Sequence, residues 1–484
     1  MGGLCGWIGQ SGSAVENKQL IERMLKPITQ FDEHTDQTVI GNKSALATVA
    51  PQRSIHTFKQ DGVLVGLWGH VRFLDKKHNQ DQPIENVAKI LFQNWLESGE
   101  SALVNLEGEF LLCILDENQH KAVLAVDRMS SRSFTYQVLG ETLVFSSTAD
   151  AINQHPLVKP EVNPQSLYNY IYFHMIPSPD SVYKDQHRLI PGECLVFKNG
   201  NTETKNYWAA SFNEKGGRSF EDLKQEFLQI LRSSVRKFAG DESVGAFLSG
   251  GTDSSTIAGI LSEVSGKPAK TYSIGFEAEG YDEMAYARIA AEHFSTQHHE
   301  YYVTPDDVVA AIPQIAAIFD QPFGNASAIP AFYCARMAKA DGLNKMLGGD
   351  GGDELFGGNE RYAKQYLFSL YEILPPLLRK KLIEPLSLNI SNHIKFSLIR
   401  KARSYIEQAS VPMPARMATY NLLDHYGSDV VFNPEFLATI NSGYPDELMG
   451  RFYHQVEAGN IVNSMAAFDW KLTLADNDLP KVVK

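Results

Sequence analysis

Residues 249–255 (SGGTDSS) form a stretch of chemically useful groups directly after the apolar run 244–248. A strand that passes through a glycine turn into a helix gathers backbone N–H groups and the positive end of the helix dipole around one concavity. The three serine hydroxyls add donors, and Asp253 offers a carboxylate for Mg²⁺. The stretch predicts a phosphate site, although the same residues also suit an ordinary turn before an N-capped helix.

A second glycine-rich segment lies about a hundred residues further on. Residues 344–347 predict a short buried strand, which opens into residues 348–358 (GGDGGDELFGG). Glycines let a backbone approach a ligand closely, and here they allow Asp350 and Asp353 to project into the same space. A surface loop does not need this composition, so the two segments together favour a nucleotide-phosphate site over a simple turn.

The two segments resemble the synthetase domain of the asparagine synthetase family, which has an SGGxDSS loop and a later GxGxDE segment. The resemblance implies that ATP is split to AMP and pyrophosphate while a carboxylate becomes an acyl-adenylate, which ammonia or an amine converts to an amide. It makes Asp253 and Asp353 the Mg²⁺ ligands, and Asp350 the residue that steadies the adenylate and the attacking amine, where relatives more often have Glu. The implied ATP and pyrophosphate contacts are Leu248, Ser249, Gly250, Gly251, Asp253, Ser254, Ser255, Ile274, Gly348 and Gly349.

The residue types fit this chemistry without the resemblance. Departing pyrophosphate carries negative charge, which Mg²⁺ and fixed N–H donors stabilise in a water-poor cleft. The sequence has no GxxxxGK[ST] motif and no GxGxxG between a strand and a helix, which argues against Walker ATPases and dinucleotide enzymes. A nucleotide thiolase is disfavoured because no CxxC motif is present.

The beginning of the chain also resembles this family, whose first domain is an N-terminal-nucleophile glutaminase that opens with Met-Cys-Gly-Ile. Here the matching residues are 5–9 (CGWIG), so Cys5 acts as the nucleophile only if residues 1–4 are removed. Residues 68–70 (WGH) replace the Asn-Gly-Glu of glutaminases, while Arg53 corresponds to the arginine that binds the carboxylate of glutamine. We therefore expect a degenerate glutaminase in which Cys5 is a small buried residue.

The nitrogen donor and the acid substrate are left open by the sequence. With a disabled glutaminase, the donor is free ammonia or an amine on the substrate itself, as the resemblance to β-lactam synthetases and lasso-peptide cyclases implies. The acid is then a small-molecule or peptide carboxylate. Residues 320–327 (DQPFGNAS) lie where the family binds its acceptor substrate.

The end of the chain, residues 469–481, resembles a family segment that normally continues into a further helical stretch bearing a lysine for the α-phosphate. Spacing assigns that role to neither Lys481 nor Lys484. The expectations are an incomplete chain, weak catalysis, or a site completed by another subunit, with a homodimer as one form. A different class of function also stays open, a non-catalytic nucleotide-binding scaffold.

Composition narrows the class of protein. The chain has 484 residues, 43% hydrophobic and 21% charged, which allows two or three domains with their own cores. Its formal net charge of −13 argues against nucleic acid as a partner. Four widely spaced cysteines, no export signal and no apolar run of membrane-spanning length predict a cytoplasmic protein without membrane association.

The elements that must position these residues change character near residue 205. Apolar runs at 63–68, 110–115, 122–126 and 142–145, with helical stretches at 84–98 and 164–173, predict an α+β domain over residues 1–205. The resemblance makes this domain a glutamine amidotransferase type 2-like, N-terminal-nucleophile-like sandwich. Residues 206–484 alternate helices with strands at 244–248, 271–276 and 300–303, which predicts an α/β parallel sheet, followed by a helical C-terminal subdomain. The resemblance classes it as adenine-nucleotide α-hydrolase-like.

Overall fold

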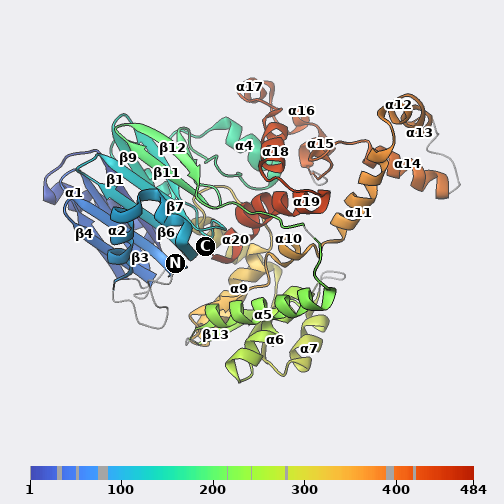
Figure 1. Cartoon of the computed structure of the whole chain (residues 1–484), viewed down its shortest axis with the longest axis horizontal. Coiled ribbons are helices and arrows are strands. Elements are labelled where there is room, and N and C mark those ends of the chain that lie inside the picture. Colours follow the sequence, from blue (N-terminus) through green and yellow to red (C-terminus); the bar gives the residue numbers. More distant parts are fainter. Residues whose placement is uncertain are drawn as a thin grey trace.

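The computed structural model describes residues 2–29, 35–50, 54–74, 86–214, 216–240, 243–277, 282–388, 397–417 and 421–483. Two antiparallel six-stranded sheets and one parallel four-stranded sheet organise these residues. Figure 1 shows the two antiparallel sheets side by side at one end of the molecule, with the helical segments at the other. The predicted fold class, a sandwich followed by a parallel α/β unit and a helical end, is confirmed.

The first antiparallel sheet has the order β10-β8-β9-β1-β3-β2. Its strands are β1 (Gly3–Ile8), β2 (Thr35–Ile40), β3 (Ser44–Ala50), β8 (Thr135–Leu139), β9 (Thr142–Ser146) and β10 (Gln186–Arg188). The second sheet has the order β12-β11-β7-β6-β5-β4. Its strands are β4 (Ile55–Gln60), β5 (Val63–Phe73), β6 (Leu106–Asp116), β7 (Lys121–Val126), β11 (Glu193–Lys198) and β12 (Asn201–Asn206).

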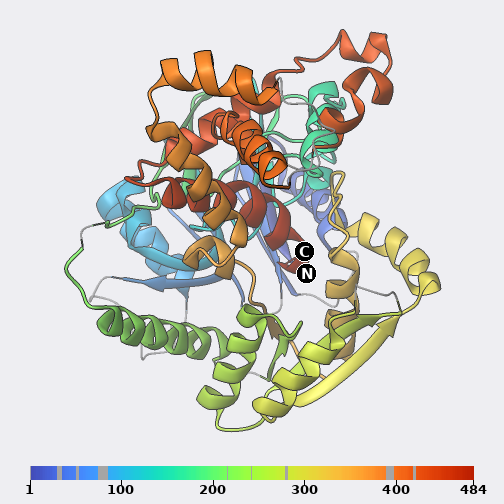
Figure 2. The same ribbon diagram turned by 90° about the vertical axis from the view of Figure 1, so that its right-hand side faces the viewer.

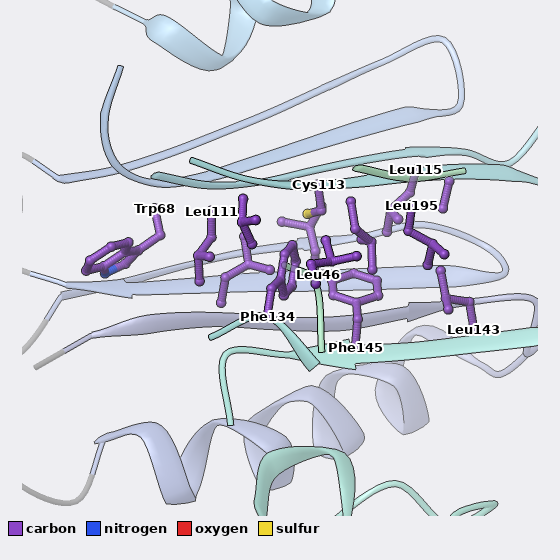
Figure 3. Close-up of a cluster of buried hydrophobic side chains, with 14 of the residues drawn as sticks. Leu46, Trp68, Leu111, Cys113, Leu115, Phe134, Leu143, Phe145 and Leu195 are labelled. Carbon is purple, nitrogen blue, oxygen red and sulfur yellow. The ribbon is translucent and has the colours of Figure 1, made fainter. Parts of the chain in front are cut away.

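Apolar side chains from both sheets meet between them and form the core of the sandwich (Figure 3). Leu46 of β3 and Phe145 of β9 pack there against Leu111 of β6. The outer face of the first sheet is covered by α1 (Ala14–Thr29), and that of the second by α2 (Val87–Ser98). Because helices cover the outer faces as well, several strands are buried on both sides and lack the simple alternation of a half-exposed sheet.

The parallel sheet has the order β15-β14-β13-β16. Its strands are β13 (Val244–Phe247), β14 (Lys270–Phe276), β15 (Gln297–Val303) and β16 (Lys345–Leu347). Its helices are α5 (Phe220–Ala239), α6 (Thr252–Ser265), α7 (Met284–His293), α8 (Pro305–Ile318) and α9 (Ala328–Ala340). The strand predicted at 300–303 begins three residues earlier, because Gln297 to Glu300 pair with β14 despite their polar side chains. The division predicted near residue 205 lies at the end of β12.

Short helices and one long helical run follow the parallel sheet (Figure 2). The short helices are α10 (Gly352–Phe356), α11 (Glu360–Ser369), α12 (Pro376–Leu378), α13 (Glu384–Leu388), α14 (Ser397–Ala409), α15 (Leu422–Tyr426), α16 (Ser428–Val431), α17 (Pro434–Leu437) and α18 (Tyr444–Gln455). The long run consists of α19 (Ile461–Asp469), a π-helical segment η6 (Trp470–Asp478) and α20 (Leu479–Val483). It lies between the sandwich and the parallel sheet, as Figure 1 shows. None of the described helices is both long and apolar enough to cross a membrane.

Candidate functional site

The turn between β13 and α6 places residues 249–255 at the carboxyl edge of the parallel sheet. Gly250 has a φ of 86°, and a Cβ there would lie 2.5 Å from the backbone nitrogen of Ala287, so the turn requires glycine at this position. The Ser254 hydroxyl accepts from the backbone N–H of Ser249 at 3.2 Å and lies 2.9 Å from its hydroxyl. These bonds join the turn to the first turn of α6.

The second glycine-rich loop packs directly against the first, because β16 pairs with β13 in parallel and both strands end at the same edge. A Cβ on Gly349 would lie 2.7 Å from the backbone nitrogen of Ser254. A Cβ on Gly352 would lie 2.3 Å from Oδ2 of Asp253. The glycines thus allow the two loops to approach each other, as well as any ligand between them.

Together the two loops line an open pocket of about 470 Å³, a size typical of small-molecule sites. Of the residues predicted to contact ATP, the pocket is lined by Leu248, Ser249, Asp253, Ser254, Ile274 and Gly349. Gly250, Gly251, Ser255 and Gly348 lie in the same two loops but are not part of the lining. The hydroxyl of Ser255 is buried and has no hydrogen-bond partner within the described part of the chain.

Acidic side chains gather in this pocket. Asp253, Asp350 and Asp353 all line it, as the sequence predicts. Burial, and then the negative charges of Asp353 and Asp350, raise the pKa of Asp253 above its ordinary value. This mutual repulsion is relieved by a bound cation.

Mg²⁺ fits this arrangement as an ion shared with phosphates. Within the described residues, no three acidic, cysteine or histidine side chains already converge on a common metal position. Mg²⁺ is commonly held by one or two carboxylates together with substrate phosphate oxygens and water. Asp253 and Asp353 are oxygen donors of the required kind beside the phosphate-type turn, so they are the residues that would hold it.

Lys481 is a site residue that the sequence interpretation missed. Its ammonium group lies 3.1 Å from Oδ1 of Asp350 and 3.0 Å from Oδ1 of Asp478, and it lines the pocket. Burial alone lowers the pKa of Lys481, but the two carboxylates outweigh it and the pKa is raised, so the side chain stays cationic. Spacing alone did not assign the α-phosphate role to Lys481, and the structure shows its side chain in the lining of this pocket.

The fold explains why spacing failed there. Lys481 lies in α20, directly after the π-helical segment η6, and π geometry advances the chain by a different angle from an α-helix. The pattern Asp478-x-x-Lys481 was the available signal, because residues three apart on a helix can pair. Lys484 lies outside the described residues.

Of the residues predicted for a glutaminase site, the described one, Cys5, is not accessible to a substrate. Cys5 is fully buried within β1 and packs among Trp7, Ile21 and Met24. Burial, and secondarily Cys113, raise the pKa of the Cys5 thiol strongly, which disfavours the thiolate that a nucleophile needs. Arg53 lies outside the described residues.

The segment that replaces the glutaminase Asn-Gly-Glu is part of β5. Trp68 is buried in the sandwich core, and the guanidinium of Arg132 lies 4.5 Å from the centre of its indole ring. His70 is exposed, and its Nε2 lies 3.1 Å from the Ser54 hydroxyl. Position 68, where the resemblance to glutaminases implies an asparagine amide, therefore carries a large indole.

The comparisons with known proteins agree with the two halves of the fold. A family model described as asparagine synthase matches residues 226–481, more than half of the chain. A model described as a glutamine amidotransferase domain matches residues 68–208. In the fold, an antiparallel sandwich precedes a parallel sheet with a phosphate-type turn. The chain belongs to the asparagine synthase family.

Curated relatives carry the same family name. A putative glutamine-hydrolysing asparagine synthetase 2 of Methanocaldococcus jannaschii is 31% identical over 63% of this chain and 60% of its own length. The glutamine-hydrolysing asparagine synthetase 1 of Bacillus subtilis strain 168 is 28% identical over 61% of this chain and 46% of its own. The matched region thus spans about half to three fifths of each of these relatives.

Among solved structures, an allosteric regulatory enzyme of purine biosynthesis matches 72% of this chain and 89% of its own, with 12% identity and a TM-score of 0.30.

Proposed function

We propose that the protein is an ATP-dependent amide ligase, which joins a carboxylate to ammonia or an amine and releases AMP and pyrophosphate. The observation that carries the proposal is the pocket of about 470 Å³ in which the phosphate-type turn, Asp253, Asp353, Asp350 and Lys481 meet. Membership of the asparagine synthase family supports it. The asparagine synthetase activity in the names of its relatives makes aspartate the first acid to test.

Each group in the pocket has a part in the proposed reaction. A carboxylate oxygen attacks the α-phosphorus, the bond to the bridging oxygen of the β-phosphate breaks, and pyrophosphate leaves with the bonding electrons. The turn at residues 249–255 binds the departing pyrophosphate through its N–H and hydroxyl groups. Mg²⁺ held by Asp253 and Asp353 would neutralise phosphate charge. Lys481 places an ammonium beside the same pocket for the charge on the α-phosphate.

The second step forms the amide. A nitrogen nucleophile attacks the acyl carbon, AMP leaves, and the nitrogen gives up a proton. Asp350, whose Oδ1 lies 3.1 Å from the ammonium of Lys481, orients this nucleophile and accepts the proton in the proposed reaction. Pro330, Ala331 and Cys334 of α9 form part of the pocket wall and limit the access of water to the adenylate.

We further propose that the nitrogen comes from ammonia or an amine in solution and not from glutamine. The support is the buried Cys5 thiol with its raised pKa and the indole of Trp68 in the sandwich core. Both features remove the ionised thiolate and the free volume that hydrolysis of glutamine requires.

The test is the release of pyrophosphate and AMP by the purified full chain with Mg-ATP, across aspartate and a panel of other carboxylates. Ammonia and glutamine are compared as donors, and Asp253→Asn serves as the inactive control. Acid-dependent AMP release that ammonia supports and glutamine does not is the expected result. Release supported by glutamine and abolished by Cys5→Ala would contradict the proposed donor. No acid-dependent release across the panel, despite bound ATP, would contradict the ligase itself.

A further inference from the structure

A second open cleft, of about 560 Å³, lies beyond the loop that leads into α9. One wall is α8, a second is the loop of residues 319–326, and the third comes from the sandwich, through Asp150 and Tyr183. Ser327 and Pro330 line the ATP pocket, whereas Ala326, Ala328 and Ile329 line this cleft. The first turn of α9 therefore separates the two spaces, and we call the second one the α8–α9 cleft.

Most of the cleft wall is hydrocarbon. Ile312 and Ile315 of α8 face it, together with Phe319 and Phe323. The two phenyl rings are stacked, with centres 4.3 Å apart and planes 9° from parallel. Ile312 is 54% exposed, which leaves a large apolar side chain at the mouth of the cleft. Such a wall favours a ligand with an apolar body, which loses contact with water on binding.

The charged side chains in the described lining of the cleft are acidic. Asp150 and Asp320 are the ionisable carboxylates in its wall, and none of the described lining residues is basic. Asp320 is held in place because its Oδ2 accepts from the backbone N–H of Ala149 at 2.7 Å. Burial, and then the negative charges of Asp150 and Asp320, raise the pKa of Tyr183. Both carboxylates therefore act on this side chain. Carboxylates and the faces of aromatic rings both attract cations and repel anions.

We propose that the α8–α9 cleft binds a small organic cation, namely an ammonium group on an apolar body about the size of an arylalkyl chain. The apolar wall takes the body, and Asp150 and Asp320 take the ammonium. The loop of residues 320–327 thus binds an amine on the side away from the ATP pocket.

A hydrogen-bonded chain joins this cleft to the ATP pocket. Asn325 lines the cleft, and its side-chain amide donates to Oδ1 of Asp478 at 3.1 Å. The same oxygen lies 3.0 Å from the ammonium of Lys481, which in turn pairs with Asp350. A ligand that moves the loop of Asn325 changes the carboxylate that holds Lys481, so occupation of the cleft alters ATP turnover. This last consequence rests on the proposed function, whereas binding itself does not.

Binding is tested by titration calorimetry of the full chain with phenethylamine, and with 3-phenylpropionate as an anion of similar apolar body. Ile312→Lys brings a positive charge to the mouth of the cleft, whereas Ile312→Glu removes the same isoleucine but adds a negative charge. Val309→Lys is the matched control, because Val309 is 70% exposed on the same helix and does not line the cleft. Both positions are at the surface of α8, where folding tolerates polar residues.

Phenethylamine is expected to bind and 3-phenylpropionate not to bind. Ile312→Lys should weaken binding by about tenfold or more, because a like charge opposes the ligand at short range, while Ile312→Glu and Val309→Lys should change it by less than about threefold. In pyrophosphate release, phenethylamine should change the rate of the wild type and of Val309→Lys but not that of Ile312→Lys. Absence of phenethylamine binding, equal binding of the anion, or equal affinity in the two lysine variants would each overturn the proposal. If phenethylamine binds to a protein that releases no pyrophosphate, the proposed cation site is supported and only the proposed ligase activity is contradicted.

Discussion

At the scale of single residues, the candidate ATP pocket is a balance between carboxylates and one ammonium. Asp253, Asp350 and Asp353 line the same pocket, and burial, followed by the negative charges of Asp353 and Asp350, raises the pKa of Asp253. Lys481 offsets part of this charge on one side, and a divalent cation with its phosphates would offset the rest. We therefore propose that the pocket binds Mg-ATP better than either Mg²⁺ or ATP alone.

Replacing Lys481 with methionine keeps a side chain of similar length without its charge. We expect pyrophosphate release to fall by roughly 10²–10³-fold, because a fixed cation beside the reacting phosphate is lost from a partly enclosed site. Lys481→Arg keeps the charge and should recover part of the rate, while Mg-ATP binding should weaken much less than turnover. Equal rates in wild type and Lys481→Met would remove Lys481 from the reaction.

Asp127 makes a separate residue-scale prediction about stability. Its carboxylate accepts from the backbone N–H groups of Phe110, Met129 and Ser131. Burial nevertheless dominates and raises its pKa from 3.8 to about 6, with Glu109 adding to the shift. Because the folded pKa exceeds the unfolded one, the stabilising contribution of the protonated form is present below about pH 4 and lost as the pH rises through 6.

The change to make is Asp127→Asn, which cannot titrate. The unfolding free energy of the wild type, minus that of the variant, should fall by roughly 2–3 kcal/mol between pH 4 and pH 7. Denaturant unfolding of both proteins across this range measures the difference, and other titrating groups cancel in the comparison. A difference that does not vary with pH would show that Asp127 is not the group responsible.

At the scale of elements, two loops from neighbouring parallel strands form the pocket by packing against each other. Both loops could be predicted from glycine spacing, because strands, turns and helix starts have strong local signals. The strands at 122–126 and 142–145 and the helix at 164–173 were likewise predictable from apolar periodicity. The position of Lys481 could not be predicted, since it depends on π-helical geometry in η6 and on contacts between distant segments.

Gly250 of the first loop can be tested against Gly251, its neighbour in the same turn. Gly250→Ala forces an alanine into a φ of 86° and against the backbone of Tyr286 and Ala287, so it should destabilise the protein by roughly 2–4 kcal/mol and abolish ATP binding. Gly251→Ala meets only the Ser249 hydroxyl, at 3.4 Å, and has an ordinary negative φ. It should cost less than about 1 kcal/mol.

Denaturant unfolding and ATP titration calorimetry of the two variants provide the measurement. The glycine variants differ by one position in the same turn, so a general effect of added volume predicts equal outcomes. Unequal outcomes in the expected direction support a turn whose shape depends on Gly250. Full ATP affinity in Gly250→Ala would contradict this conclusion.

At the scale of the whole molecule, the run α19, η6 and α20 contacts both the sandwich and the parallel-sheet unit. Lys471 and Asp476 form a buried ion pair within η6, and both bond to Ser178 of the sandwich. The Ser178 hydroxyl donates to Asp476 at 2.8 Å, and the Lys471 ammonium donates to the Ser178 carbonyl at 3.0 Å. Lys481, which pairs with Asp350 in the ATP pocket, belongs to the same run. We therefore expect the contacts between the sandwich and η6 to help position Lys481.

Breaking this buried pair is the test of that connection. Lys471→Met leaves Asp476 buried without its partner, which should cost roughly 3–5 kcal/mol of unfolding free energy, whereas the double variant Lys471→Met with Asp476→Leu should recover much of the loss. Lys18→Met, in the exposed pair with Glu22 4.0 Å away, is the control and should cost less than about 1 kcal/mol. The double variant lacks the hydrogen bonds that Lys471 and Asp476 make to Ser178. If these bonds help to position Lys481, the double variant should be stable yet slower in pyrophosphate release. Full activity in that variant would instead mean that Lys481 is positioned by Asp350 and Asp478 alone.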